Sequence, residues 1–146
     1  MRRLGLKDTR IIKEVSQLIE RELSLQCERY HYTEFTIAAR EEKIRRFFTY
    51  YHDLVLVEER DDELIGVIWA HFDKGNRTVN IEFLWVAPLH RKCGYGARLK
   101  REVEKWGKDQ QAVALTSTVN VQNDSMLALN RKLGYETEQV IMRKKL

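Results

Sequence analysis

The chain has 146 residues, which suits a single domain spanning residues 1–146. An apolar fraction of 43%, a charged fraction of 33% and a single proline exclude collagen-like, low-complexity and largely disordered chains. The longest apolar stretch, 64–70, is far shorter than the roughly 20 residues of a membrane span. The N-terminus has no apolar signal region, and only two cysteines occur. We therefore expect a cytoplasmic chain without a disulfide framework.

The net charge is +4, and the basic residues alternate with acidic ones, as in the segment 100–105. A nucleic-acid binder usually gathers its positive charge into one stripe. We therefore expect no nucleic-acid or membrane partner, although a small positive excess suits a small anionic ligand. The four histidines have no metal-ligand spacing, so no metal site is predicted.

The first third of the chain is predicted to hold two helices. A short strand at 3–7 precedes Asp8, which occupies a helix N-cap position. Apolar residues then recur at helical spacing over 9–26. The polar and aromatic segment 27–36 predicts a loop, and a second apolar helical pattern covers 37–51.

Three strands follow with short turns between them, at 54–57, 64–72 and 78–86, and they predict an antiparallel meander. Strict alternation in the third strand predicts two opposite faces. One face would carry Val79, Ile81, Phe83 and Trp85, and the other Asn80, Glu82, Leu84 and Val86.

The last third alternates between helices and strands. A glycine-bearing loop leads into a helix at 95–108, then a strand at 112–118, a helix at 125–133 and a last strand at 140–142. The fold class predicted from this order is an α/β sandwich. Its mixed, mostly antiparallel sheet would have six to seven strands and about four flanking helices.

The loop from Arg91 to Gly96 carries the clearest chemical signal. A strand that enters a glycine loop and then a helix exposes backbone N–H groups at the positive end of the helix dipole, which favours an anion. Glycine lets a phosphate approach the backbone closely. Considered alone, the same pattern also fits a turn that merely begins a helix.

Two motifs resemble the GNAT superfamily of acetyl-CoA-dependent N-acetyltransferases. The segment 91–96 is similar to its Arg/Gln-x-x-Gly-x-Gly/Ala signature and follows a strand and a Val-x-Pro. The segment 123–135 resembles its Asn-x-x-Ala-x-x-x-Tyr-x-x-x-Gly-Phe pattern, with Asn123 and Gly134-Tyr135 in place. The element order fits this family over nearly the whole chain.

The resemblance implies acetyl-CoA as cosubstrate, and it implies which residues bind it. Backbone amides of the loop would cradle the pyrophosphate, and the end of the preceding strand would pair with the pantetheine arm. Asn123 would hydrogen-bond the cofactor, or act as a plain N-cap. The implied cofactor-binding residues are Leu84, Trp85, Val86, Arg91, Lys92, Cys93, Gly94, Tyr95, Gly96 and Asn123.

The resemblance also implies catalytic residues, with one departure from the family. Asn130 stands where the family often has a tyrosine that protonates the departing thiolate, and an amide cannot deliver a proton. Glu82 lies on the strand where many members carry a carboxylate base; otherwise it is a solvated edge residue. His71 is a weaker candidate base, because a hydrogen-bonded structural histidine is the favoured explanation for it.

The acceptor pocket of the family lies between the first two helices. Tyr30, His31, Tyr32 and Glu34 fall there, although an aromatic loop packed on the sheet would show the same residues. The activity implied is transfer of an acetyl group to a primary amine of a small molecule or peptide. The alternative is a non-catalytic acyl-CoA-binding regulatory module. A monomer and a homodimer both remain open, and the sequence does not name the acceptor.

Overall fold

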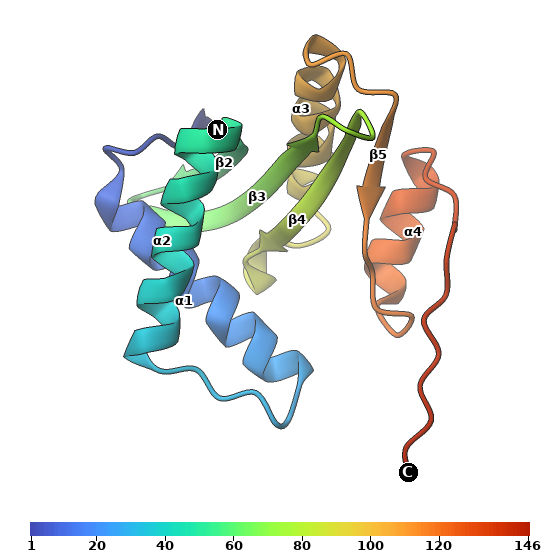
Figure 1. The fold of residues 1–146 in the computed structure, drawn as a ribbon, viewed down its shortest axis with the longest axis horizontal. Coiled ribbons are helices and arrows are strands. Elements are labelled where there is room, and N and C mark those ends of the chain that lie inside the picture. Colours follow the sequence, from blue (N-terminus) through green and yellow to red (C-terminus); the bar gives the residue numbers. More distant parts are fainter.

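The computed structural model describes residues 1–146 as five strands and four α-helices around one mixed sheet (Figure 1). The strand order is β1-β2-β3-β4-β5, and every neighbouring pair is antiparallel except β4 and β5, which are parallel. In chain order the elements are β1 (Arg2–Arg3), α1 (Thr9–Gln26), α2 (Glu34–Tyr51), β2 (Leu54–Arg60), β3 (Glu63–Asp73), β4 (Thr78–Val86), a 3₁₀ helix (Pro88–His90), α3 (Tyr95–Asp109), β5 (Ala114–Ser117) and α4 (Asp124–Lys132).

Each face of the sheet is covered by helices, and each has its own apolar core. On one face, Ile12 and Val15 of α1 and Ile44 of α2 pack against the sheet. On the other face, Leu99 and Val103 of α3 do so. These positions repeat at the helical period, so the amphipathic pattern of the sequence places each helix with its apolar side inward. None of the helices is both long and apolar enough to cross a membrane.

The two helices of the first third begin differently. Asp8 occupies the N-cap position of α1, yet its carboxylate makes no cap bond and instead accepts from the Gly5 N–H at 2.8 Å. α2 begins at a capping box, in which Thr33 and Thr36 each accept the backbone N–H of the other. This cap starts the helix three residues earlier than the predicted 37, because the apolar pattern that guided the prediction begins after the cap.

The two faces predicted for β4 are wrong, because a β-bulge interrupts the strand. Trp69 of β3 pairs with Phe83, while the next residue of β3 pairs with Ile81, so Glu82 has no partner. One extra residue in a strand moves every side chain after it to the opposite face of the sheet. Val79 and Ile81 accordingly pack on the α3 side, while Phe83 and Trp85 pack on the α1 and α2 side.

The sheet has five strands, not the predicted six to seven, and the last strand predicted at 140–142 does not form. Residues beyond Tyr135 make no hydrogen bond within the chain, and all of 136–146 is exposed. β5 is also shorter than the predicted 112–118. The apolar pattern of the tail was identified correctly, but a strand forms only where another strand offers a free edge beside it.

Candidate functional site

The loop between the 3₁₀ helix and α3 presents unpaired backbone donors. The N–H groups of Lys92, Cys93 and Gly94 have no acceptor within the protein. They precede the first turn of α3, whose own N–H groups also lack helical partners. Lys92 and Gly94 both have left-handed backbone conformations, with φ of 60° and 84°. The result is a curved row of donors at the positive end of a helix dipole.

Gly96 brings three elements together at this loop. A Cβ atom at this position would lie 3.3 Å from Cδ2 of Leu129 in α4 and 4.0 Å from Cγ2 of Val86 in β4. The loop itself is held against the end of β4, because the Arg91 Nε donates to the Val86 carbonyl oxygen at 2.9 Å. A side chain at Gly96 would fill the cradle that these contacts form.

β4 and β5 separate next to this loop. β5 pairs only with residues Thr78 to Ile81, and the last pair is Ile81 with Ser117. The remaining part of β4, which includes Leu84, Trp85 and Val86, has no strand partner on the β5 side. In an antiparallel ladder half of the backbone groups face away from β3, so this edge needs a ligand or water to satisfy it.

α4 closes the other side of the opening. Asn123 caps the helix, because its Oδ1 accepts the Met126 N–H at 3.1 Å. Asn130 is buried on the same helix, and its Oδ1 has no hydrogen-bond partner. Asn123 therefore fills the N-cap role, while Asn130 presents an unsatisfied buried amide oxygen.

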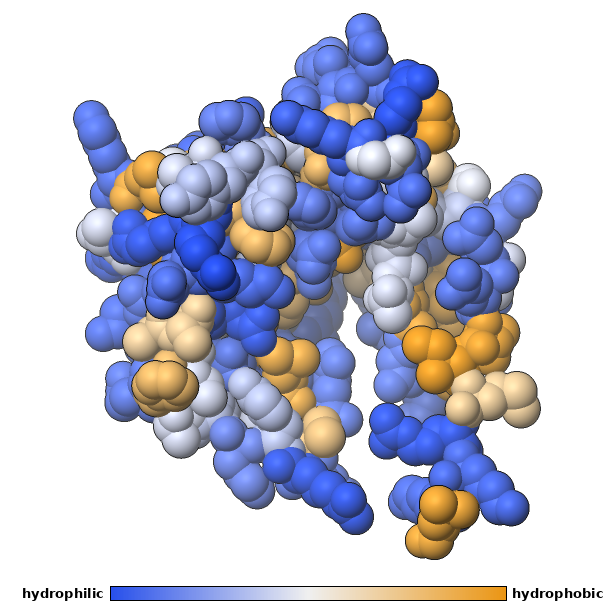
Figure 2. Space-filling model, viewed as in Figure 1, coloured by the Kyte–Doolittle hydropathy of each residue, from blue (hydrophilic) through white to orange (hydrophobic).

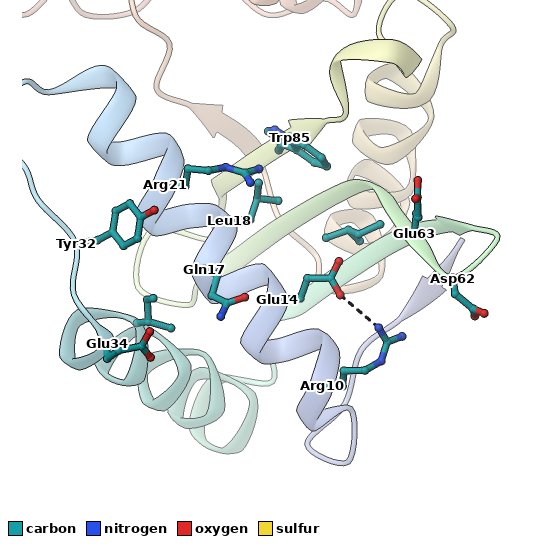
Figure 3. Close-up of a pocket in the computed structure, with 12 residues that line it drawn as sticks. Arg10, Glu14, Gln17, Leu18, Arg21, Tyr32, Glu34, Asp62, Glu63 and Trp85 are labelled. Carbon is teal, nitrogen blue, oxygen red and sulfur yellow. Dashed lines mark ion pairs between the residues drawn. The ribbon is translucent and has the colours of Figure 1, made fainter.

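A pocket of about 590 Å³ lies between α1, the start of α2 and the turn that joins β2 to β3 (Figure 3). Trp85 lines it from the part of β4 that has no strand partner on the β5 side. Its charged lining comprises four carboxylates and two guanidinium groups. The carboxylates are Glu14, Glu34, Asp62 and Glu63, and the guanidinium groups are Arg10 and Arg21. One pair is already neutralised, because Arg10 lies 3.5 Å from Glu14, so the pocket favours cations overall.

The predicted acceptor residues divide into two groups. Tyr32 and Glu34 line the pocket, whereas Tyr30 and His31 do not. The Tyr30 hydroxyl donates to Glu20, a carboxylate that is 2% exposed, and Arg40 donates to the same carboxylate at 3.1 Å. This bond raises the pKa of Tyr30. It is also the one side-chain hydrogen bond that any residue of the loop 27–32 makes.

The two predicted bases lie in different surroundings. Glu82 is exposed in the β4 bulge and forms no ion pair. His71 is held by Asp53, with Nδ1 and Oδ1 2.7 Å apart, and the other oxygen of Asp53 accepts from the Trp69 indole at 2.6 Å. Burial raises the pKa of Asp53. His71 also packs on Phe47 and lies outside the pocket, as a structural histidine would.

Several residues were not identified from the sequence. Glu14 and Arg21 each lie one helical turn from Leu18. Asp62 in the β2–β3 turn and Glu63 at the start of β3 belong to a segment that predicted only a chain reversal. Lys100, in the segment 100–105 of alternating charges, is 2% exposed, and its Nζ has no hydrogen-bond partner and lies 4.7 Å from the Tyr135 ring centre. Burial lowers the pKa of Lys100 to about 8. Its place beside Leu99 and one helical turn before Val103, on the buried side of α3, was the available signal.

Comparison with known proteins agrees with this geometry. The model of the acetyltransferase (GNAT) family matches residues 15–135. An aminoglycoside N(6')-acetyltransferase type 1 from Acinetobacter haemolyticus is 30% identical over 96 residues, which are 60% of this chain and 66% of that protein. A solved structure from Staphylococcus aureus, described as a GNAT family acetyltransferase, is 34% identical with a TM-score of 0.75 over 80% of this chain and 98% of that one. A solved aminoglycoside N-acetyltransferase in complex with CoA is 25% identical with a TM-score of 0.60, over 75% and 85% of the two chains.

The fold and the loop define an acyl-CoA-dependent transferase, and the chain belongs to the GNAT family of acetyltransferases. The predicted family and enzyme class, an N-acetyltransferase that uses acetyl-CoA, are thereby confirmed. The residues fit such a cosubstrate. Three orphaned N–H groups suit a pyrophosphate, and the absence of a Cβ at Gly96 lets the start of α3 lie close to Leu129 and Val86.

Proposed function

We propose that this enzyme transfers the acetyl group of acetyl-CoA to a primary amine of a small, polycationic molecule. The observation that carries this proposal is the pocket beside Trp85, whose lining holds four carboxylates against two guanidinium groups. Amines with several positive charges are attracted to such a cavity, whereas anionic acceptors are repelled. Similarity to aminoglycoside N-acetyltransferases, whose acceptors are amines, supports the same substrate class.

The cosubstrate is proposed to lie along the opening between β4 and β5. The backbone N–H groups from Arg91 to Gly96 would bind the pyrophosphate, and the open edge over Leu84, Trp85 and Val86 would pair with the pantetheine arm. Bound there, acetyl-CoA supplies a thioester carbonyl that an amine can attack. The Asn123 Oδ1 is already engaged in its helix cap, so the amide nitrogen is the atom left to reach the cosubstrate.

The amine must lose a proton before it attacks. Glu82 is the carboxylate proposed to receive this proton, through water, because the bulge turns it out of both cores. A backbone N–H of the open β4 edge would stabilise the negative charge that develops on the carbonyl oxygen. Asn130 can donate or accept a hydrogen bond, but it supplies no proton to the departing thiolate. Turnover is therefore expected to be slower than with a positioned acid, by about 10²-fold.

The absence of a proton donor at Asn130 also favours a second candidate, a module that binds acyl-CoA without turnover. A thiol-release assay distinguishes the two. Acetyl-CoA is supplied with an aminoglycoside, a polyamine or a peptide amine, and free CoA is measured with a thiol reagent. We expect turnover with the polycationic small molecules. Binding of acetyl-CoA without thiol release on any acceptor would support the module instead.

The substrate class is tested by removing pocket charge. Glu34→Gln and Asp62→Gln should each raise the KM for a polycationic acceptor several-fold and leave acetyl-CoA binding unchanged. Glu42→Gln is the matched control, because Glu42 is exposed on α2 outside the pocket and has no ion-pair partner. Equal KM values for all three variants would contradict the assignment of this pocket to the acceptor.

A further inference from the structure

Arg21 is the one cationic side chain of the pocket that has no partner within the chain. The other guanidinium of the lining, Arg10, lies 3.5 Å from Glu14 and 3.8 Å from Glu59. No ion pair, side-chain hydrogen bond or cation–π contact involves the Arg21 guanidinium, and the Ser24 hydroxyl bonds only to its backbone carbonyl. Because the Arg21 side chain is also exposed, its charge is available to a ligand.

The unpaired charges of the pocket define the molecule that it complements. The Arg10 and Glu14 side chains neutralise each other. The lining then holds one guanidinium, on Arg21, against three carboxylates that have no ion-pair partner, on Glu34, Asp62 and Glu63. A molecule that matches this lining carries cationic groups in excess and, in addition, one anionic group. A purely cationic amine would leave the Arg21 charge facing a like charge.

The guanidinium and the carboxylates lie in different parts of the pocket. Arg21 follows Glu14 by two turns on the same side of α1, which is about 10 Å along the helix axis. In Figure 3 the Arg21 side chain extends toward Trp85. Asp62 and Glu63 lie across the pocket from it in the same view. The anionic group of an acceptor therefore belongs beside Trp85, and its further cationic group belongs near the carboxylates.

Trp85 also lies on the strand edge where the acetyl group is proposed to be transferred. It belongs to the part of β4 that has no strand partner on the β5 side. In Figure 1 the end of β4 lies between α1 and α4, and Figure 2 shows the molecule hollowed there, with hydrophilic residues on both rims. A carboxylate bound by Arg21 is thus placed next to the amine that attacks the thioester. An α-amino acid has this arrangement, since a single carbon atom separates its amine nitrogen from its carboxylate.

We propose that Arg21 binds a carboxylate of the acceptor, and that the acceptor is an α-amino acid with a cationic side chain, acetylated at its α-amine. The inference rests on the proposed function and narrows its substrate class. A guanidinium suits this partner because its N–H groups match the two carboxylate oxygens. In the reaction the α-nitrogen forms a bond to the acetyl carbon, and the carbon–sulfur bond breaks with its electron pair on sulfur. Of the two protons that the α-ammonium loses, one ends on the CoA thiol and the other in solvent.

Acceptor pairs that differ only in the carboxylate test the proposal. Lysine is compared with cadaverine, and ornithine with putrescine, in the thiol-release assay with acetyl-CoA. We expect kcat/KM to be about tenfold higher for the amino acid of each pair, because it gains a hydrogen-bonded charge pair. Lysinamide, which keeps the α-amine without the negative charge, should behave like cadaverine, and NMR spectroscopy of the lysine product should find the acetyl group on Nα. Equal kcat/KM values within both pairs, or a product acetylated on Nε, would overturn the proposal.

Variants assign the preference for the carboxylate to Arg21. The preference for lysine over cadaverine should be lost in Arg21→Gln, and Arg21→Lys should keep part of it, since an ammonium lacks the planar fork of a guanidinium. Arg46→Gln is the control and should keep the full preference, because Arg46 is exposed on α2 outside the pocket and has no ion-pair partner. Titration calorimetry without acetyl-CoA should show the same loss in the binding of lysine to Arg21→Gln.

The outcomes separate this inference from the function on which it rests. An unchanged preference for lysine in Arg21→Gln overturns the role of Arg21, while turnover of amines by the parent protein still upholds the proposed function. Loss of acetyl-CoA binding in Arg21→Gln would assign this side chain to the cosubstrate and also overturn the inference. Absence of thiol release with every amine overturns the proposed function, and this inference with it.

Discussion

The α1 and α2 side of the sheet and the region after β5 are organised in opposite ways. On the first, eleven buried apolar residues form one core, and a buried carboxylate, Glu20, receives two hydrogen bonds. In the second, Asn130 is the one buried residue of α4, and everything beyond Tyr135 is exposed. The first region is a well-packed scaffold, whereas the second contributes little buried surface. The opening between β4 and β5, where the cosubstrate is proposed to lie, is on the border between them.

Core truncation should show the largest difference between the two regions. Ile12→Ala on α1 is expected to lower the free energy of unfolding by about 2–5 kcal/mol, because it leaves a cavity at a fully buried site. The same deletion in the exposed C-terminal tail, Ile141→Ala, should cost the folded monomer less than about 0.5 kcal/mol. Urea denaturation, with both changes made in the chain truncated after residue 142, measures them. Equal losses in the free energy of unfolding for Ile12→Ala and Ile141→Ala would contradict the contrast between the two regions.

Blocking the cradle should abolish cosubstrate binding without disturbing the scaffold. Gly96→Asp places a side chain against Leu129 and adds negative charge where the pyrophosphate is proposed to bind. Acetyl-CoA should raise the melting temperature of the parent protein, since it binds the folded state alone, and should not raise that of the variant. Gly75→Ala, in the β3–β4 turn, is the control and should keep the shift. A shift retained in Gly96→Asp would place the cosubstrate elsewhere.

Replacing the buried Lys100 should stabilise the folded protein. Lys100→Met removes an unpaired amine from an apolar site while keeping its length, and we expect a gain of about 1–3 kcal/mol at pH 7. Because the pKa of Lys100 is lowered to about 8, the unfolded chain binds a proton that the folded chain has lost between about pH 8 and 10.5. The parent protein should therefore gain stability as pH rises through that window, and the variant should not.

Thermal unfolding from pH 7.5 to 9.5 tests this prediction. The range lies below the titration of Tyr135, whose pKa is raised by burial to about 12. Lys105→Met, at an exposed position of the same helix, is the control and should keep the rise with pH. A parallel pH profile for Lys100→Met and the parent would mean that the amine is solvated.

The smallest effect is expected at the loop that Tyr30 holds. Tyr30→Phe removes its hydrogen bond to Glu20 and should cost about 1 kcal/mol at most. Because Tyr32 and Glu34 follow directly and line the pocket, the KM for the acceptor should rise two- to five-fold, while acetyl-CoA binding stays unchanged. Hydrogen exchange of residues 27–33 should become faster. Tyr50→Phe, at an exposed residue of α2, should change neither quantity.

Helices and the glycine loop before α3 were predictable because their signals are local. The spacing of Ile11, Val15 and Leu18 determines which side of α1 is buried, and Gly94 permits the left-handed turn that opens α3. The four helices were predicted correctly for this reason. Part of the pocket lining was predicted, because Tyr32 and Glu34 lie in or beside the loop between α1 and α2. Asp62 and Glu63 were missed, because they lie far along the chain, where β2 joins β3.

The faces of β4 show why pattern alone fails in a sheet. Residues 78–86 alternate regularly, and nothing in them marks Glu82 as the unpaired residue. The bulge depends on the pairing with β3, so the sequence of β4 does not contain it. Lys100 presents a related difficulty, since its charged neighbours favour solvent exposure, yet it is buried and its Nζ lies over the Tyr135 ring.

By itself, the sequence determined the helices, the glycine loop and the family, because helical periodicity and a short motif are properties of neighbouring residues. The tertiary structure decided which way Glu82 faces, which carboxylates share a pocket, and that the apolar C-terminal tail has no strand beside it. These features depend on contacts between segments distant in the chain. A strand in particular is completed by its neighbour, so a segment with the composition of a strand remains extended and exposed until an edge is offered to it.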